Sequence, residues 1–100
     1  MINLRALNEA EIKQRLEDLP DWAFENNKLR REFNFNTFKE GIEFINDLAP
    51  IFDKLDHHAD MYIYHRKIIF ELSRFDIGNK VTNLDFTEAM MIERMKEIKK

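Results

Sequence analysis

The spacing of apolar and polar residues at the start of the chain predicts a short helix. Asn8 and Glu11 form the cap-x-x-Glu pattern that is typical of a helix N-terminus, and apolar residues then recur every three or four positions as far as Leu19. Pro20 ends this helix, because the residue before a proline is disfavoured in the α region. We therefore expect one amphipathic helix in this part of the chain.

Two apolar runs follow, separated by Asn26 and Asn27. Asparagine tolerates a positive φ, so this pair is suited to a tight turn between strands. The pattern predicts a β-hairpin made of residues 21–26 and 28–35.

The middle of the chain has the period of a long helix. Thr37 and Glu40 form a second capping pattern, and an apolar stripe begins there. The stripe that we expect to be buried consists of Phe38, Ile42, Ile45, Leu48, Phe52 and Leu55. Pro50 lies within it, lacks an N–H and clashes with the preceding turn, so we expect a kink or a split into two helices.

Alternating residues predict a second hairpin. Its strands are residues 61–65 and 67–75, with the turn near Arg66 and Lys67. The residues expected on the core face of its second strand are Ile68, Phe70 and Leu72.

The C-terminal part predicts a last helix. Gly78 interrupts the pattern, and Thr82 and Asp85 then form a third capping pattern. The residues expected on the buried side of this helix are Met91, Met95 and Ile98. The order helix, hairpin, helix, hairpin, helix predicts a single α+β domain over residues 1–100. We expect a four-stranded antiparallel sheet of two hairpins with about three helices packed on one face.

The composition narrows the classes of function. The chain has 100 residues, 16 basic and 19 acidic side chains, and a net charge of −3. This mild acidic balance argues against nucleic acid or an anionic membrane as the main partner. There is no cysteine, which excludes disulfides, thiolate nucleophiles and cysteine-based metal sites. No apolar run reaches the roughly 18 residues of a membrane span, and no signal-peptide pattern is present, so we expect a cytoplasmic protein.

The residues best suited to chemistry gather at the end of the long helix. His57 and His58 are adjacent and lie among acidic residues, from Asp53 to Asp60. Imidazole can give and take protons near neutral pH, and a nearby carboxylate can fix its tautomer. Another interpretation is that the pair only interacts with the dipole at the helix C-terminus. A metal ion is not expected, because ligand-type side chains crowded into so short a segment suit no common single-ion geometry.

The order of residues around the two histidines resembles a known signature. The segment Lys54-Leu55-Asp56-His57-His58, followed by an acidic residue and an aromatic strand, is similar to the signature of the pterin-4a-carbinolamine dehydratases. Asp53 matches an acidic residue four positions before the first histidine of that family, and Asp85 matches an aspartate in the first turn of its last helix. Further similar steps are Leu19-Pro20-Asp21-Trp22, Phe33-x-Phe35-x-x-Phe38 and Leu72-Ser73.

The resemblance implies an activity and the residues that carry it. Members of this family dehydrate 4a-hydroxytetrahydropterins, such as 4a-hydroxytetrahydrobiopterin, to the quinonoid dihydropterin and water, without a metal or an organic cofactor. The expected catalytic residues are His57, His58 and Asp85. The residues expected to orient a histidine or contact the pterin are Asp53, Met61, Tyr62 and Phe75. The resemblance also implies a homodimer or homotetramer with a part in tetrahydrobiopterin biosynthesis.

The chain departs from the family pattern at several positions. Ala59 stands where proline is usual, and Met61 stands where an aromatic residue is usual. Phe75 stands where a third histidine is usual, and His65 is expected to be exposed near a turn instead of replacing it. Loss of one of three proton-transfer groups predicts an enzyme of reduced activity that is not necessarily inactive.

Two other functions fit the same residues. The first is a noncatalytic pterin-binding or protein-dimerisation module on the same fold. The second is a structural oligomer, assembled through a sheet edge or through a methionine-rich helix face formed by Met90, Met91 and Met95. Convergence of the histidines and Asp85 on one accessible site would favour catalysis.

Overall fold

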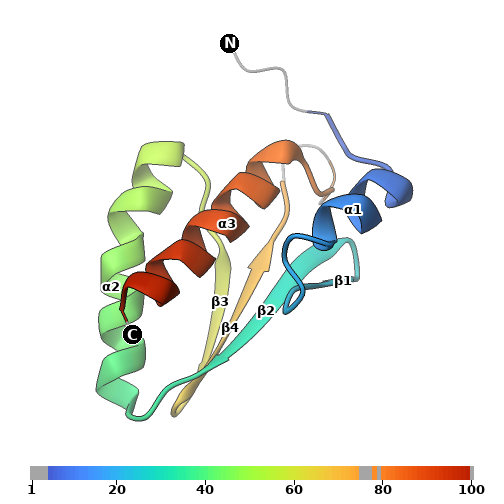
Figure 1. Ribbon diagram of the computed structural model, residues 1–100. Helices are drawn as coiled ribbons and strands as arrows, with labels where there is room; N and C mark the ends of the chain where they lie inside the picture. Colours follow the sequence, from blue (N-terminus) through green and yellow to red (C-terminus); the bar gives the residue numbers. More distant parts are fainter. Residues whose placement is uncertain (1–4, 75–77, 79, 100) are drawn as a thin grey trace.

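The elements follow one another in the predicted order of helix, hairpin, helix, hairpin and helix (Figure 1). The computed structural model describes residues 5–74, 78 and 80–99. Its elements are α1 (Glu9–Leu16), β1 (Ala23–Glu25), β2 (Lys28–Asn34), α2 (Phe38–Leu55), β3 (Asp60–Tyr64), β4 (Lys67–Leu72) and α3 (Asn83–Ile98). Within these described ranges, no helix is long and apolar enough to cross a membrane.

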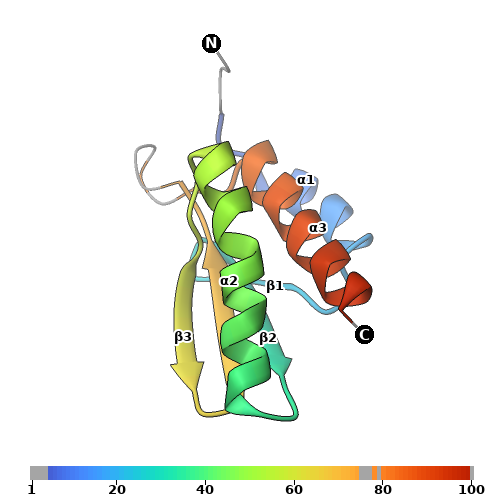
Figure 2. The same ribbon diagram turned by 90° about the vertical axis from the view of Figure 1, so that its left-hand side faces the viewer.

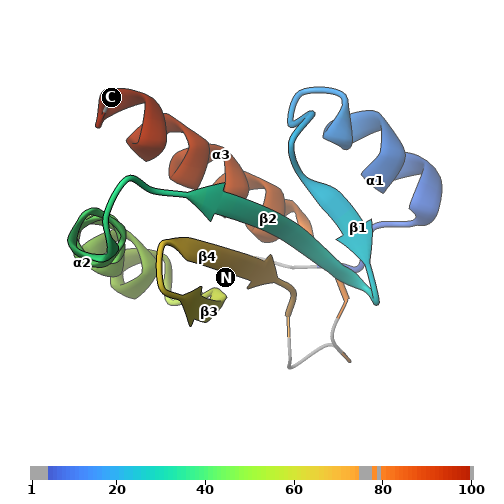
Figure 3. The same cartoon turned by 90° about the horizontal axis from the view of Figure 1, so that it is seen from below.

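The strands form one antiparallel sheet in the order β1-β2-β4-β3. The central pairing of β2 with β4 joins the two hairpins and sets Leu29 opposite Leu72 and Phe33 opposite Ile68. Opposed residues lie on the same face of a sheet, so these buried side chains form a continuous apolar face. The helices cover this face, and the other face is left open (Figures 2 and 3). The predicted fold class is confirmed.

The two hairpin turns depend on residues that accept a positive φ. Asn26 and Asn27 have φ values of 51° and 63°, which confirms the predicted turn. The second turn is at His65 and Arg66, one residue earlier than predicted, and His65 has a φ of 53°. Histidine is among the residues that accept this region most readily, which explains the position of the turn. β4 ends at Leu72, before the predicted end at residue 75.

The long helix α2 is one segment despite Pro50, so the expected split does not occur. Its cap is as predicted, since the Thr37 side chain accepts a hydrogen bond from the N–H of Glu40. Pro50 is exposed, whereas Leu48 and Phe52 on either side of it are buried. Packing of these two residues in the core holds the helix together across the missing backbone hydrogen bond.

The buried face of α2 differs from the predicted stripe. Phe38 was expected to be buried but is 49% exposed, whereas Phe44 is only 2% exposed. The buried residues are Gly41, Phe44, Leu48 and Phe52. Gly41 explains this choice of face, because a Cβ atom there would lie 2.9 Å from Cδ1 of Ile68. The glycine lets the helix backbone approach the sheet closely at this point.

The buried face of α3 also differs from the prediction. Met91 is 36% exposed and Ile98 is 71% exposed, and Met95 is half-buried. The residues that are buried instead are Asp85, Phe86, Glu88, Ala89 and Ile92. The predicted side of the helix is therefore correct only for Met95, which packs against the core, whereas the fully buried apolar residues are Phe86, Ala89 and Ile92.

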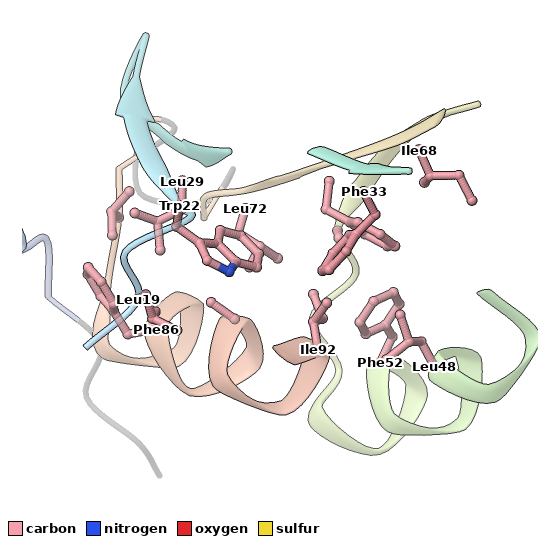
Figure 4. Packing of buried hydrophobic residues seen from close by; sticks show 14 of the residues in the cluster. Leu19, Trp22, Leu29, Phe33, Leu48, Phe52, Ile68, Leu72, Phe86 and Ile92 are labelled. Atoms are coloured by element: carbon pink, nitrogen blue, oxygen red, sulfur yellow. The ribbon is translucent and has the colours of Figure 1, made fainter. Parts of the chain in front are cut away.

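A single core lies between the sheet and the helices (Figure 4). Phe44 is central to it, with ring centroids 5.4 Å from that of Phe33, 5.5 Å from Phe35 and 6.0 Å from Phe70. Tilted and edge-on aromatic contacts of this kind add to the hydrophobic contribution of each ring. The core fixes α2 on the sheet and thereby places the C-terminal end of this helix.

The contrast between Phe44 and Phe38 gives a prediction for stability. Phe44→Ala should lower the free energy of unfolding by about 3–5 kcal/mol, because it leaves a cavity among packed rings. Phe38→Ala is the matched control on the same helix and should change it by less than about 0.5 kcal/mol. Urea denaturation followed by circular dichroism measures both values. Equal losses for the two variants would show that the packing face is assigned wrongly.

Candidate functional site

The two adjacent histidines follow a sharp reversal of the chain at the end of α2. Asp56 has a left-handed conformation, with φ 52° and ψ 42°, and its N–H bonds back to carbonyls of the last helical turn. The N–H of His57 then bonds to the carbonyl of Phe52 at 3.2 Å. This backbone cap ends the helix without help from an imidazole. Both imidazoles are therefore available to other partners.

His57 points inward and bonds to Asp85 on α3. Its Nε2 atom lies 2.5 Å from Oδ1 of Asp85, and the side chains are 6% and 0% exposed. A carboxylate can only accept in such a bond, so Nε2 carries a proton and donates it. The Nδ1 atom of a neutral His57 is then the one left to accept a proton. The carboxylate also fixes the orientation of the ring.

The side chain of Asp85 also takes part in the N-terminal cap of α3, in which Thr82 is the N-cap residue. Its Oδ2 atom accepts hydrogen bonds from the N–H of Thr82 at 2.8 Å and from the Thr82 hydroxyl at 3.2 Å. The Thr82 side chain in turn accepts from the N–H of Leu84 and from the N–H of Asp85, and the second of these bonds completes the predicted capping box. One carboxylate group therefore starts a helix with one oxygen and holds an imidazole with the other.

His58 lies in a different environment. Its Nε2 atom is 2.8 Å from Oδ1 of Asp53, and these side chains are 56% and 77% exposed. The ring also stands edge-on to Phe52, with centroids 6.3 Å apart. An exposed pair of this kind contributes little to stability and holds its ring loosely. The imidazole of His58 can therefore adapt to a ligand and exchange protons with water.

Two other expected site residues, Met61 and Tyr62, lie on opposite faces of the sheet. Met61 lies opposite Phe70 on the helix-covered face of the sheet, whereas Tyr62 lies opposite Ile69 on the open face. The charge of the Glu71 carboxylate raises the pKa of Tyr62, and a hydrogen bond to the same group adds to this effect.

Among the residues that the structure describes, no hydrogen bond joins Tyr62 to His57 or His58. His65 lies at the exposed turn, as expected. Phe75 lies outside the described residues.

The sequence prediction missed Glu88, an acidic residue on the same helix as Asp85. It is fully buried, one helical turn after Asp85. Neither of its carboxyl oxygens has a hydrogen-bond partner in the described part of the chain. Burial, together with the negative charge of Asp85, raises the pKa of Glu88 to about 8. The signal in the sequence was a glutamate at helical spacing from Asp85 and Ile92.

The remaining chemical options are limited within the described ranges. No group of three or more histidine, cysteine, aspartate or glutamate side chains there is placed to hold a metal ion. The arrangement consists of one buried and one exposed histidine, each bonded to a carboxylate. Such a pair is suited to giving a proton at one point of a substrate and taking one at another.

Comparison with known proteins shows similarity along most of the chain. A model of the family described as pterin 4 alpha carbinolamine dehydratase matches residues 5–95. A protein of Sulfolobus acidocaldarius named "putative pterin-4-alpha-carbinolamine dehydratase" is 42% identical over 89 residues, which are 89% of this chain and 97% of that protein. A protein of the same name from a Picosynechococcus species is 34% identical over 89% of this chain and 96% of its own length.

A solved structure supports the same comparison. It is the crystal structure of a transcriptional coactivator/pterin dehydratase from Brucella melitensis, which superposes with a TM-score of 0.85. The two chains are 26% identical, and the match covers 91% of this chain and 98% of the other.

Proposed function

The chain belongs to the pterin 4 alpha carbinolamine dehydratase family, and on this premise we propose that it is a hydro-lyase that removes water from 4a-hydroxytetrahydropterin. The observation that carries the proposal is the placement of His57 and His58. Each imidazole is bonded to a carboxylate, yet one is buried and the other is exposed. Residues with the same chemistry in unlike surroundings can take opposite parts in one proton transfer.

The proposed reaction needs one base and one acid. The base removes a proton from a ring nitrogen, and the electron pair of that N–H bond forms a double bond to C4a. The C4a–oxygen bond breaks, and the acid gives a proton to the departing hydroxyl, which leaves as water. The products are water and the quinonoid dihydropterin. No net charge, electron or proton is gained or lost by the substrate, so no further reactant is needed.

The chain offers a residue for each of these parts. We assign the two proton transfers to His57 and His58, with Asp85 and Asp53 as the groups that orient them. With each Nε2 bonded to a carboxylate, Nδ1 is the atom of each ring that exchanges the proton. Asp85 is thus proposed to act through His57, which differs from the sequence-based expectation that Asp85 is itself a catalytic residue.

Met61 and Tyr62 stay proposed pterin contacts. Because neighbouring residues of a strand point to opposite faces, a flat ligand on one face of the sheet would contact only one of them. Met61 is the better candidate, since it lies on the face to which the helices contribute. The cytoplasmic location stays a prediction from the sequence pattern, and the part in tetrahydrobiopterin biosynthesis stays a prediction from the resemblance.

A noncatalytic binding function is the alternative. The printed description of the Brucella melitensis structure joins coactivator and dehydratase, so a protein of this fold is associated with both functions. In this chain, the exposed apolar residues of an edge strand favour a binding function. They are Met61, Tyr62, Ile63 and Tyr64 of β3.

The same strand supports an assembly of identical chains. β3 pairs with β4 on one side only, so its other side presents free backbone groups beside exposed apolar side chains. A second copy could extend the sheet there by antiparallel pairing. We propose a homodimer formed at this edge, from which a homotetramer can be built.

The first prediction of this proposal concerns the histidines. His57→Ala and His58→Ala should each lower the rate of dehydration above background by about 10²-fold or more, because each removes a proton-transfer group. The measurement follows the ultraviolet absorbance of chemically generated 4a-hydroxytetrahydropterin. His65→Ala is the matched control, since this exposed histidine lies in a turn, and it should retain the wild-type rate. A folded wild-type protein with no rate above background would leave the binding function as the better proposal.

The second prediction concerns the missing third histidine. Phe75→His should raise kcat/KM for the pterin by up to about 10²-fold, because it would restore a third group for proton transfer. The same absorbance assay measures the gain, with Phe75→Leu as the control for loss of the aromatic ring alone. An unchanged rate in a variant that still binds pterin would contradict the expectation that Phe75 weakens the enzyme.

The third prediction concerns assembly. Sedimentation velocity should show that the wild-type protein is a dimer or tetramer. Replacing Ile63 with lysine should shift the assembly toward the monomer, because a charge at a paired edge opposes sheet extension. Met90→Lys is the control, at an exposed methionine on α3, and it should leave the assembly intact. A wild-type monomer at micromolar concentration would exclude the proposed dimer.

A further inference from the structure

Glu88 is a buried acid one helical turn after Asp85, the carboxylate that bonds to His57. Its side chain is 0% exposed, and both carboxyl oxygens lack a hydrogen-bond partner within the described ranges. Burial of a charged carboxylate without a partner is strongly unfavourable, so the group keeps its proton instead. Its pKa, raised to about 8, agrees with this, and Glu88 is therefore neutral at neutral pH.

The surroundings of Glu88 tie it to His57. On α3, Asp85 lies one turn before it, on the same side of the helix, and its charge acts on Glu88. His57 lies at the junction between α2 and β3 and is linked to this helix by its bond to Asp85. The connection from β4 to α3 contributes Thr82, which is polar but uncharged. In the described part of the chain, no lysine, arginine or histidine bonds to Glu88 to offset a negative charge.

We propose that Glu88 is a positioning residue for the dehydration: as a neutral carboxyl, it leaves Asp85 as the single negative charge beside His57, and so allows His57 both to take up and to release a proton. The inference rests on the proposed function of His57 in proton transfer. Glu88 has no solvent-accessible surface and acts through Asp85 and His57 without touching the substrate.

The proposal has a consequence at alkaline pH. When Glu88 ionises, two negative carboxylates stand one helical turn apart in a buried site. Their combined field favours the positively charged form of His57, since an opposite charge nearby stabilises an imidazolium. An imidazolium cannot accept a proton from the substrate. The rate should therefore fall as the pH rises through about 8, the value to which the pKa of Glu88 is raised.

The direct test is a titration of the histidine rings by nuclear magnetic resonance, without substrate. In the wild-type protein, the ring signals of His57 should show an inflection near the pKa of Glu88, at about pH 8. Glu88→Gln has the shape of the neutral acid and cannot ionise, so this inflection should vanish. The signals of exposed His65 report any general change and should show no such difference. Glu97→Gln, at an exposed glutamate of the same helix, should leave the His57 titration as in the wild type.

The second readout is the pH dependence of dehydration. At about one pH unit above the inflection, wild-type kcat should be lower by about tenfold, because only about a tenth of Glu88 is still protonated. In Glu88→Gln, this alkaline loss should disappear, whereas a residue with a merely structural function would lower the rate equally at every pH. Glu97→Gln should keep the wild-type profile.

The outcomes separate this inference from the proposed function. A wild-type protein without dehydratase activity would remove the proposed function, yet the titration of His57 would still show whether Glu88 acts on it. Identical His57 titrations in the wild type and in folded Glu88→Gln would overturn the inference even for an active enzyme. If Glu88→Gln does not fold, the wild type decides alone: no inflection at His57 between about pH 7 and pH 9 would overturn it.

Discussion

The buried carboxylate of Asp85 is the interaction on which both the last helix and the candidate site depend. Its two oxygens have different partners, the N–H and hydroxyl of Thr82 on one side and Nε2 of His57 on the other. The N-terminus of α3 needs an acceptor for its free N–H groups whatever the protein does. The second oxygen is then held at a fixed place, and the imidazole that bonds to it is oriented by the same contact that starts the helix.

The left-handed residue at the end of α2 supplies the other half of this arrangement. A helix that continued past Asp56 would separate the directions of His57 and His58 by about 100° and carry both away from α3. The reversal at Asp56 ends the helix with backbone bonds alone and turns His57 inward. Hydrogen bonds to charged groups are stronger in a buried site, so the His57–Asp85 bond is firmly held, while the exposed His58–Asp53 pair is not. Two neighbouring residues thereby acquire a rigid and an adaptable imidazole.

Local rules made the sequence informative about some elements and misleading about others. The caps at Thr37 and Thr82 and the turn at Asn26 were predictable, because each depends on residues close in sequence. Phe38 was placed wrongly, because an apolar spacing of three or four positions is compatible with two neighbouring faces of a helix. Only the close approach of Gly41 to the sheet selects the face that carries Phe44.

The candidate site was likewise predictable from the sequence only in part. An aspartate in the first turn of α3 could be expected from the capping pattern. The pairing of His58 with Asp53 could not be expected from helical spacing, because the two residues are five positions apart and the left-handed Asp56 lies between them. The contact between His57 and Asp85 joins distant segments, and no periodic pattern contains it. The family resemblance indicated only that both residues belong to the site. Glu88 was missed because a glutamate on a helix is ordinarily exposed, and the sequence pattern does not show that this one is buried.

The burial of Glu88 lowers the stability of the folded chain, and this is the strongest argument that the residue has a function beyond packing. Between its ordinary pKa of 4.5 and the raised value of about 8, the unfolded chain has lost the proton of Glu88 while the folded chain retains it. Stability therefore falls as the pH rises across this interval, since the folded state binds more protons than the unfolded state. A leucine at the same position would pack without this loss and without two unpaired oxygens. The position of this acid is explained if its proton affects His57. Asp85 links the two residues, because it bonds to His57 and its charge acts on Glu88. His57 in turn is one of the two proposed proton-transfer residues.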